Sequence, residues 1–341
     1  MTSDLLLDVR DLKVHFPAKR AGLFGPPRTV QAVDGVSLAI TRGATLGLVG
    51  ESGSGKTTTA QAIMRLVPTT SGHIELDGQN FLELDAAALI QARRKIQMIF
   101  QDPYSSLNPR RRAGAIVREP MDRMNIRPPD ERDGRVAELF QVVGLRPEQR
   151  ALFPHQFSGG QRQRIGIARA LATEPKLLVC DEPVSALDVA IQAQVLNLLR
   201  RLQSQLGLSM LFISHDLGVV RHVCQDIAVM YLGRIVEQAD RVSLFRRPLH
   251  PYTSALISSV PSARVGSGTH QQRIKLEGDP PSPIDLPRGC SFAGRCPYAV
   301  DRCRQERPDL RPLPSGRRVA CHLIGPDERA PDQHPLTTKS G

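Results

Sequence analysis

The chain has 341 residues, enough for a full domain core and a smaller additional module, and its hydrophobic content of 40% is ordinary for a globular protein. Lysine and arginine number 45 against 34 acidic residues, and the resulting charge of +11 suits nucleic acid, an anionic membrane surface or nucleotide phosphates. Aromatic residues make up only 4%, and no basic run is interleaved with rings, so we expect no nucleic-acid partner.

No apolar run approaches the length needed to cross a bilayer, and the first residues lack the charged start and cleavage site of a signal peptide. We therefore expect a protein that stays in the cytoplasm. Alternating apolar residues predict strands over Leu5 to Phe16 and Ala32 to Ile40. The basic stretch between them, Pro17 to Gln31, is rich in glycine and proline and predicts a loop or loose hairpin.

A glycine-rich turn ending in Lys-Thr follows the next buried strand, Ala44 to Val49, and opens a helix over Thr57 to Arg65. Such a turn is a nest of backbone N–H groups shaped for phosphate, so the segment is predicted to be a P-loop. Lys56 is expected to reach the β- and γ-phosphates, and the Thr57 hydroxyl to ligate Mg²⁺. The nucleotide-binding residues predicted here are Gly50, Glu51, Ser52, Gly53, Ser54, Gly55, Lys56, Thr57 and Thr58.

Phe16, at the end of the first predicted strand, is a candidate to stack on the adenine ring, with burial in the core as the equally weighted alternative. Further along, Lys95 to Phe100 reads as an apolar strand that stops at Gln101, after a short strand and turn over Gly72 to Gly78. Ligand-facing groups collect at the carboxyl edge of a parallel sheet, which makes Gln101 a candidate site residue.

From Leu107 to about Phe157 the pattern becomes helical and irregular, which predicts a helical insertion. Ser158, Gly159, Gly160 and Gln161 follow it and open a helix over Gln163 to Ala172, with Ser158 as its N-cap. Taken alone, this motif is equally well explained as a capped helix with flexible glycines.

The buried strand Lys176 to Glu182 delivers two adjacent carboxylates, Asp181 and Glu182, at its end. This is the natural position for a partner of Mg²⁺ and a general base, and paired acids there are costly unless they are used. A helix is predicted over Val189 to Leu206, and the strand Leu208 to Ile213 ends in a polar run that includes His215.

The order of these motifs resembles that of the ATP-binding-cassette (ABC) ATPases, over about Leu5 to Gln238. The resemblance implies a P-loop NTPase α/β fold, with a RecA-like core sheet, an antiparallel β-subdomain and a helical subdomain at about 102–163. It implies Walker A at Gly50 to Thr57, the Q-loop at Gln101, and the signature motif at Ser158 to Gln161. The same resemblance implies that Mg²⁺ is bound by Thr57, Gln101 and Asp181, and that Glu182 is the catalytic base. It also implies that Ser185 to Asp188 form the D-loop and that His215 is the switch histidine. Phe157 departs from the family, in which many members carry leucine, but the exchange is apolar for apolar.

The segments Phe157 to Leu171, Cys180 to Val195, Leu249 to Thr253 and Glu277 to Pro297 resemble the ATPases of oligopeptide and dipeptide importers. The resemblance implies an ATPase domain over 1–240, an importer-type C-terminal module over 241–325 and a disordered tail over 326–341. Implied partners are two membrane permease subunits, a second similar ATPase and, indirectly, a solute-binding protein, with the chain at the cytoplasmic face of the membrane. The alternatives are an importer ATPase for nickel or glutathione, a soluble ABC ATPase without a transport role, and a metal-cluster sensor.

Cys290, Cys296, Cys303 and Cys321 gather in a proline-rich segment with little apolar core. Disulfides are disfavoured in a reducing cytoplasm, which favours a metal site over unpaired thiols. Zinc is one option, but the spacing is wider than that of Cys-x-x-Cys knuckles, and Cys296-Pro297 is similar to ferredoxin ligand runs. The importer resemblance implies a four-iron, four-sulfur cluster on these cysteines, with His322 as a weaker substitute ligand.

Overall fold

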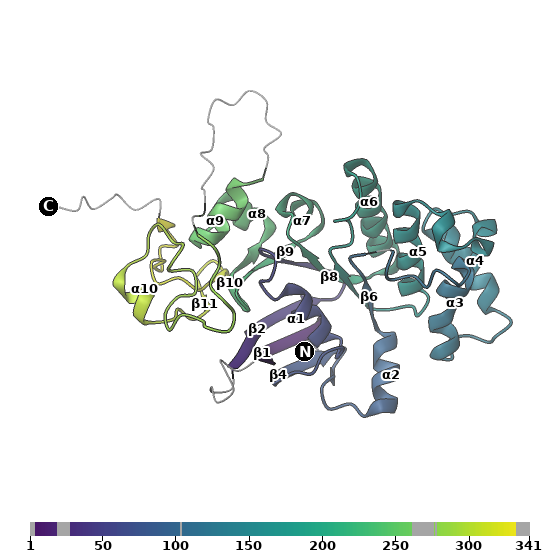
Figure 1. Ribbon diagram of the computed structural model, residues 1–341, viewed down its shortest axis with the longest axis horizontal. Helices are drawn as coiled ribbons and strands as arrows, with labels where there is room; N and C mark the ends of the chain where they lie inside the picture. The colour runs from purple at the N-terminus through teal and green to yellow at the C-terminus, as the bar shows by residue number, and fades with distance from the viewer. Residues whose placement is uncertain (1–3, 19–27, 103, 261–275, 277, 332–341) are drawn as a thin grey trace, which may run out of the picture.

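A computed structural model describes residues 4–18, 28–102, 104–260, 276 and 278–331 of the chain. Two sheets organise this part: an antiparallel sheet with strand order β2-β1-β4-β5 and a larger mixed sheet with order β11-β12-β10-β9-β3-β8-β7-β6 (Figure 1). The antiparallel sheet consists of β1 (Leu5–Ala18), β2 (Arg28–Thr41), β4 (Ser71–Leu76) and β5 (Gln79–Asn80). The larger sheet consists of β3 (Thr45–Val49), β6 (Ile96–Ile99), β7 (Leu177–Asp181), β8 (Ser209–Ser214), β9 (Asp226–Tyr231), β10 (Arg234–Asp240), β11 (Arg311–Pro312) and β12 (Arg318–Val319).

The centre of the larger sheet is parallel, with β6, β7, β8, β3 and β9 running in one direction, while β10 returns antiparallel to β9. Strands β3, β7 and β8 are buried along their whole length. Because both faces of a parallel sheet are covered, its strands are apolar throughout and turn polar only at their ends. The carboxyl ends of these strands are where the predicted site residues lie.

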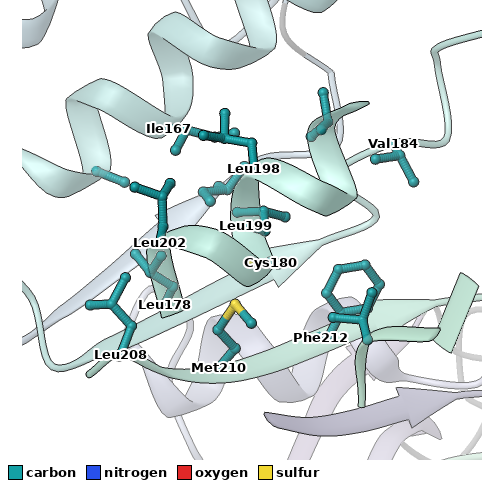
Figure 2. Packing of buried hydrophobic residues seen from close by; sticks show 14 of the residues in the cluster. Ile167, Leu178, Cys180, Val184, Leu198, Leu199, Leu202, Leu208, Met210 and Phe212 are labelled. Atoms are coloured by element: carbon teal, nitrogen blue, oxygen red, sulfur yellow. The ribbon is translucent and has the colours of Figure 1, made fainter. Parts of the chain in front are cut away.

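Helices cover both faces of this sheet. Leu178 and Cys180 on β7, with Met210 and Phe212 on β8, pack against Leu198, Leu199 and Leu202 of helix α6 (Figure 2). The intervening residues of the same strands point the opposite way, into a second apolar cluster shared with α1 and the antiparallel sheet. Helices α3, α4 and α5 lie together at one end of the molecule, as the predicted helical insertion requires (Figure 1).

Helix α6, which has a long apolar stripe, has the predicted bounds. The α-helices are α1 (Lys56–Ile63), α2 (Ala86–Arg94), α3 (Ala113–Arg123), α4 (Arg132–Val142), α5 (Gly159–Leu171), α6 (Val189–Leu206), α7 (Leu217–Val223), α8 (Arg241–Arg246), α9 (Pro251–Ser258) and α10 (Asp301–Gln305). Two short 3-10 helices, η1 (Pro147–Ala151) and η2 (Pro154–Gln156), precede α5. None of the helices within the described ranges has the length and apolar character that crossing a bilayer requires.

Of the two alternatives predicted for Pro17 to Gln31, a loop or a loose hairpin, the structure supports the hairpin, because Pro17 pairs with Thr29 and Ala18 with Arg28; residues 19–27 lie outside the described residues. Two other predicted bounds differ from the structure. Helix α5 begins at Gly159, four residues before the predicted start. The N-cap at Ser158 stabilises the first turn although two of its residues are glycines. Residues 326–331, predicted to belong to a disordered tail, are among the described residues, and Arg247 donates to the backbone oxygen of Glu328 at 2.7 Å; residues 332–341 lie outside the described residues.

Residues after 240 add to the larger sheet. Strand β12 pairs with β10 through Glu237 opposite Val319 and Gln238 opposite Arg318. The Glu237 carboxylate is fully buried and accepts hydrogen bonds from the backbone N–H groups of Leu249 and His250 and from the Arg317 guanidinium, at 2.6–2.9 Å. The C-terminal segment is therefore anchored to the sheet by backbone pairing and by a buried ion pair.

Candidate functional site

A cavity of about 660 Å³ lies beside the P-loop, at the carboxyl ends of the parallel strands. Most of its lining comes from residues that the sequence singles out, and four others come from β2 and from the segment after residue 250. The lining residues are Val30, Ala32, Gly50, Glu51, Ser52, Gly53, Gly55, Lys56, Thr57, Thr58, Gln101, Glu182, His215, Leu256 and Pro283. The fold thus brings the P-loop, the end of β6, the end of β7 and the end of β8 to one place.

The P-loop turn between β3 and α1 depends on glycine. At Gly55, φ is +102°, and a Cβ would come within 2.2 Å of the Ala32 backbone oxygen. A Cβ on Gly50 would meet the Met230 backbone oxygen at the same 2.2 Å. No side chain fits at either position, so the backbone alone shapes the turn.

Lys56 is buried at the floor of this turn. Its Nζ donates to the backbone oxygens of Gly50 and Glu51, each at 2.8 Å. Burial lowers the pKa of Lys56, while the negative charges of Glu182, Asp181 and Glu51 act in the opposite direction. The ammonium group is therefore held by loop carbonyls beside the cavity. A negatively charged phosphate oxygen binds a cation more strongly than a neutral carbonyl does, so a phosphate in the cavity can replace these contacts.

Thr57, which lines the cavity, contacts Asp181 at the end of β7, because the Thr57 hydroxyl donates to Asp181 Oδ1 at 3.1 Å. Burial raises the pKa of Asp181, and the nearby charge of Glu182 raises it further, whereas the Thr57 hydrogen bond and Lys56 lower it. A hydroxyl and a carboxylate are the hard oxygen donors that Mg²⁺ prefers. The two side chains thus fit the ion that the sequence predicts for this position.

Glu182 stands at the centre of a small polar network. Gln101 Nε2 donates to its Oε2 at 2.9 Å, and His215 Nδ1 lies 3.0 Å from its Oε1. The backbone of Glu182 is in the left-handed region, with φ of +45°, and its N–H donates to the Ile213 oxygen at 3.0 Å. Such a conformation is uncommon outside glycine and occurs at sites where a side chain is held in a fixed direction.

The predicted signature residues lie apart from this cavity, and none of them lines it. The Ser158 hydroxyl accepts from Gln161 N at 3.3 Å, and the Gln161 side chain accepts from Ser158 N at 3.0 Å, which forms a capping box at the start of α5. Gly160 faces α6 so closely that a Cβ would lie 2.4 Å from Ile191 Cγ2. Capping and packing therefore account for part of this motif within the single chain.

Phe16 is partly buried against the apolar cluster of the antiparallel sheet and does not line the cavity, although its partner across the sheet, Val30, does. Its stacking on adenine stays a prediction. Leu256 and Pro283 were missed by sequence reasoning, because no local pattern connects the segment after residue 250 to the P-loop. The backbone N–H of Gln31 donates to the Pro283 oxygen at 3.1 Å and brings that segment to the cavity.

The four C-terminal cysteines lie in one segment, and a backbone hydrogen bond joins two of them. The Cys290 N–H donates to the Cys303 oxygen at 2.8 Å. Burial raises the pKa of Cys296 to about 11 and that of Cys321 to about 12, and in both cases the charges of the neighbouring cysteines add to the shift. Across the described ranges, however, no three His, Cys, Asp or Glu side chains form a group that could hold a metal ion. The cluster therefore stays a prediction.

Two family descriptions match the chain. The first is "ABC transporter", over residues 33–185, and the second is "Oligopeptide/dipeptide transporter, C-terminal region", over residues 236–303. The first match covers the P-loop, Gln101, the start of α5 and the Asp181-Glu182 pair. The second begins on β10 and reaches into the cysteine-containing segment.

Similar proteins cover nearly the whole chain. The oligopeptide transport ATP-binding protein AppF of Bacillus subtilis is 48% identical over 94% of this chain and 98% of its own length. The dipeptide transport ATP-binding protein DppF of Escherichia coli is 46% identical over 95% of this chain and 96% of its own length.

Two solved structures of ABC proteins have a fold similar to that of this chain. A dimeric post-hydrolysis state of the ATP-binding cassette MJ0796 bound to ADP and Pi has a TM-score of 0.61 and 28% identity, covering 69% of this chain and 98% of that one. The cbiO1 component of the Clostridium perfringens ABC transporter complex cbiONQ has a TM-score of 0.61 and 27% identity, covering 72% of this chain and 92% of that one. The chain therefore belongs to the ABC transporter family, as an ATP-binding subunit with the oligopeptide/dipeptide transporter type of C-terminal region.

Proposed function

We propose that this chain is the ATP-hydrolysing subunit that powers the import of di- or oligopeptides across the cytoplasmic membrane through partner permeases. The observation that carries the ATPase role is the convergence of Lys56, Thr57, Glu182, Gln101 and His215 on one cavity. The match of residues 236–303 to the oligopeptide/dipeptide C-terminal region supports peptides as the transported solute. Nickel and glutathione importers are the alternatives within the same architecture.

The main site residues have separate proposed roles. Lys56 leaves the Gly50 and Glu51 carbonyls for the β- and γ-phosphates, and the helix N-terminus behind it adds positive potential. Thr57, Asp181 and Gln101 hold Mg²⁺, which neutralises phosphate charge when bound. Glu182 orients and deprotonates the attacking water, while His215 contacts the γ-phosphate. The carboxylate of Glu182 is already directed by Gln101 and His215, so little reorganisation is needed.

The signature residues Ser158, Gly159, Gly160 and Gln161 are proposed to bind the nucleotide held by a second ATPase subunit. They do not line the cavity of their own chain, yet the first turn of α5 presents backbone N–H groups of the kind that bind phosphate. The similarity to the dimeric MJ0796 cassette supports a face-to-face arrangement. We propose that the second subunit is a different, homologous ATPase, so that the working unit is a heterodimer.

The permeases are proposed to dock beside the start of the helical insertion. Phe100 and Tyr104 are exposed there, Tyr104 with 64% of its surface accessible. The Arg162 guanidinium lies 3.9 Å from the centre of the Tyr104 ring and connects this surface to α5. The chain would thus lie at the cytoplasmic face of the membrane, with a solute-binding protein acting on the far side of the permeases.

A reconstitution experiment tests this function. The purified chain is expected to hydrolyse ATP slowly alone and rapidly with two permeases and a second ATPase in liposomes, with further stimulation by peptide and the solute-binding protein. Stimulation by nickel or glutathione in place of peptide would reassign the solute. Full, substrate-stimulated activity with permeases and no second ATPase would refute the heterodimer, and rapid hydrolysis that ignores permeases would favour an ABC ATPase without a transport role.

We further propose that Cys290, Cys296, Cys303 and Cys321 bind a four-iron, four-sulfur cluster with a structural role. Burial raises the pKa of Cys290, Cys296 and Cys321, and the charge of Cys303 adds to each shift, so these three thiols lie within electrostatic range of Cys303; thiolates are the usual ligands of such clusters. When bound, the cluster would crosslink a segment that has little apolar core of its own. Protein purified without oxygen should then be brown and contain about four iron and four sulfide per chain.

Cys296→Ser should bleach that protein, whereas Cys224→Ser, on a buried cysteine in the ATPase core, should leave the colour unchanged. Stoichiometric zinc without iron or sulfide would replace the cluster with a zinc site. Protein that contains neither metal under these conditions would leave four unpaired thiols.

A further inference from the structure

Glu51, the second residue of the P-loop, is held by two side chains from the C-terminal segment. Its backbone N–H donates to the Tyr252 hydroxyl at 2.8 Å, across 201 residues of sequence. Its carboxylate accepts both terminal nitrogens of Arg295, at 2.8 and 3.1 Å, across 244 residues. Its backbone oxygen accepts a hydrogen bond from Lys56 Nζ at 2.8 Å. Every polar group of Glu51 therefore has a defined partner.

The two partners are themselves fixed. The Arg295 side chain is only 8% exposed, against 29% for Glu51, and its guanidinium lies 3.5 Å from the Tyr231 hydroxyl. The rings of Tyr231, Tyr252 and Phe292 pack with their centres 4.7–5.5 Å apart. Bidentate pairing of a preorganised guanidinium with a carboxylate is strong and directional. Glu51 is thus kept in one orientation by a rigid group.

This contact has an electrostatic consequence for the nucleotide cavity, which Glu51 helps to line. Without a cation beside it, the Glu51 carboxylate would present a negative charge to the polyphosphate of ATP in a partly desolvated site. Arg295 pairs with that carboxylate and neutralises its charge. Tyr252 fixes the loop backbone at the same residue.

We infer that Arg295 and Tyr252 are positioning residues for ATP binding, through which the C-terminal module controls the charge and geometry of the Walker A turn. The inference rests on ATP binding at this cavity, as the proposed function does, but not on the identity of the transported solute. The C-terminal module would then affect nucleotide affinity, in addition to the structural role proposed for its cysteines.

The test measures the Kd of a fluorescent ATP analogue, with Mg²⁺, for the full chain and a set of variants. Arg295→Met is expected to raise the Kd about five- to tenfold, the low end of usual couplings between two sites. Adding Glu51→Gln to that variant should bring the Kd back to within about twofold of wild type, because it removes the uncompensated charge. Tyr252→Phe should raise the Kd by a smaller factor.

Arg302→Met is the matched control, because Arg302 on α10 makes an equally bidentate pair with Glu306, at 2.7 and 3.1 Å, and both side chains are exposed. It should leave the Kd unchanged. Raising the salt concentration should shrink the difference between Arg295→Met and wild type, as screening weakens a charge effect.

Three outcomes separate the explanations. Arg295→Met with a wild-type Kd would overturn the inference. Failure of Glu51→Gln to restore binding, with a lowered thermal midpoint in both variants, would show that Arg295 acts through general stability, which also overturns it. A wild-type chain that binds no nucleotide would instead reject the proposed function.

Discussion

Glu182→Gln isolates the chemical role of one carboxylate within a site that otherwise stays intact. The substitution keeps the shape of the side chain but replaces one of its two acceptor oxygens with an amide donor. In the structure both oxygens are engaged, one by Gln101 at 2.9 Å and the other by His215 at 3.0 Å. The amide therefore retains one of these contacts and cannot remove a proton from water.

The expected loss follows from the proposed role. A positioned general base contributes about 10²- to 10⁴-fold to a rate, which corresponds to about 2.7–5.5 kcal/mol of transition-state stabilisation. ATP binding should persist or tighten slightly, because the variant removes a negative charge whose influence reaches Lys56. The predicted pattern is thus a large loss of turnover with an undiminished affinity.

Single-turnover phosphate release and the Kd of a fluorescent ATP analogue measure the two effects separately. Glu138→Gln, on an exposed carboxylate of α4, is the control for the same chemical change away from the cavity. Turnover at the wild-type rate in Glu182→Gln would refute the assignment of the base. Equal losses of turnover and binding would show that Glu182 serves the structure of the site rather than its chemistry.

The remaining predictions concern binding and stability. Lys56→Ala should abolish measurable ATP binding, since it removes the cation of the P-loop; binding of the analogue at the wild-type Kd would contradict this. Arg317→Met should lower the unfolding free energy by about 3–5 kcal/mol in denaturant titrations, because it leaves the buried Glu237 carboxylate without its ion-pair partner; an unchanged midpoint would refute that. Burial lowers the pKa of His250 to about 3, so the folded state keeps this ring neutral while the unfolded chain protonates it below about 6.5, and stability is lost as pH falls between these values. His250→Asn preserves a cap acceptor for the Tyr252 N–H and should reduce the slope of the unfolding free energy against pH by up to about 1.4 kcal/mol per pH unit. A slope identical to wild type would show that His250 does not cause the pH dependence.

Sequence reasoning singled out most of the residues that line the cavity, because their signals are local. Buried parallel strands are apolar until they end, so Gln101, Asp181 and His215 are visible as polar residues that follow apolar runs. The P-loop turn can be recognised in the sequence by its glycines, which the backbone of the turn requires. Helix α6 was placed at its observed bounds because its apolar stripe is long and regular.

The contacts that escaped prediction are distant in sequence and carry no periodic pattern. The strand pair β11 and β12 consists of two-residue strands, too short for alternation to be detectable. The contact of Glu51 with Arg295 joins a loop to a loop, and nothing near either residue indicates the other. The start of α5 was placed too late because two glycines lower the helix propensity that the N-cap at Ser158 offsets.

The pairing of β10 with β12 sets an order of events for the chain as it is synthesised. Strand β10 ends at Asp240, but the residues that cover its outer edge, Arg318 and Val319, emerge from the ribosome nearly 80 residues later. Until then the edge offers unpaired backbone groups and the Glu237 carboxylate lacks Arg317. Since domains fold from the N-terminus as they are made, the nucleotide core can assemble early while one side of its sheet stays open. The sheet therefore cannot be completed until residue 319 has been synthesised, and a chain released before residue 319 exposes a strand edge on which other chains can assemble.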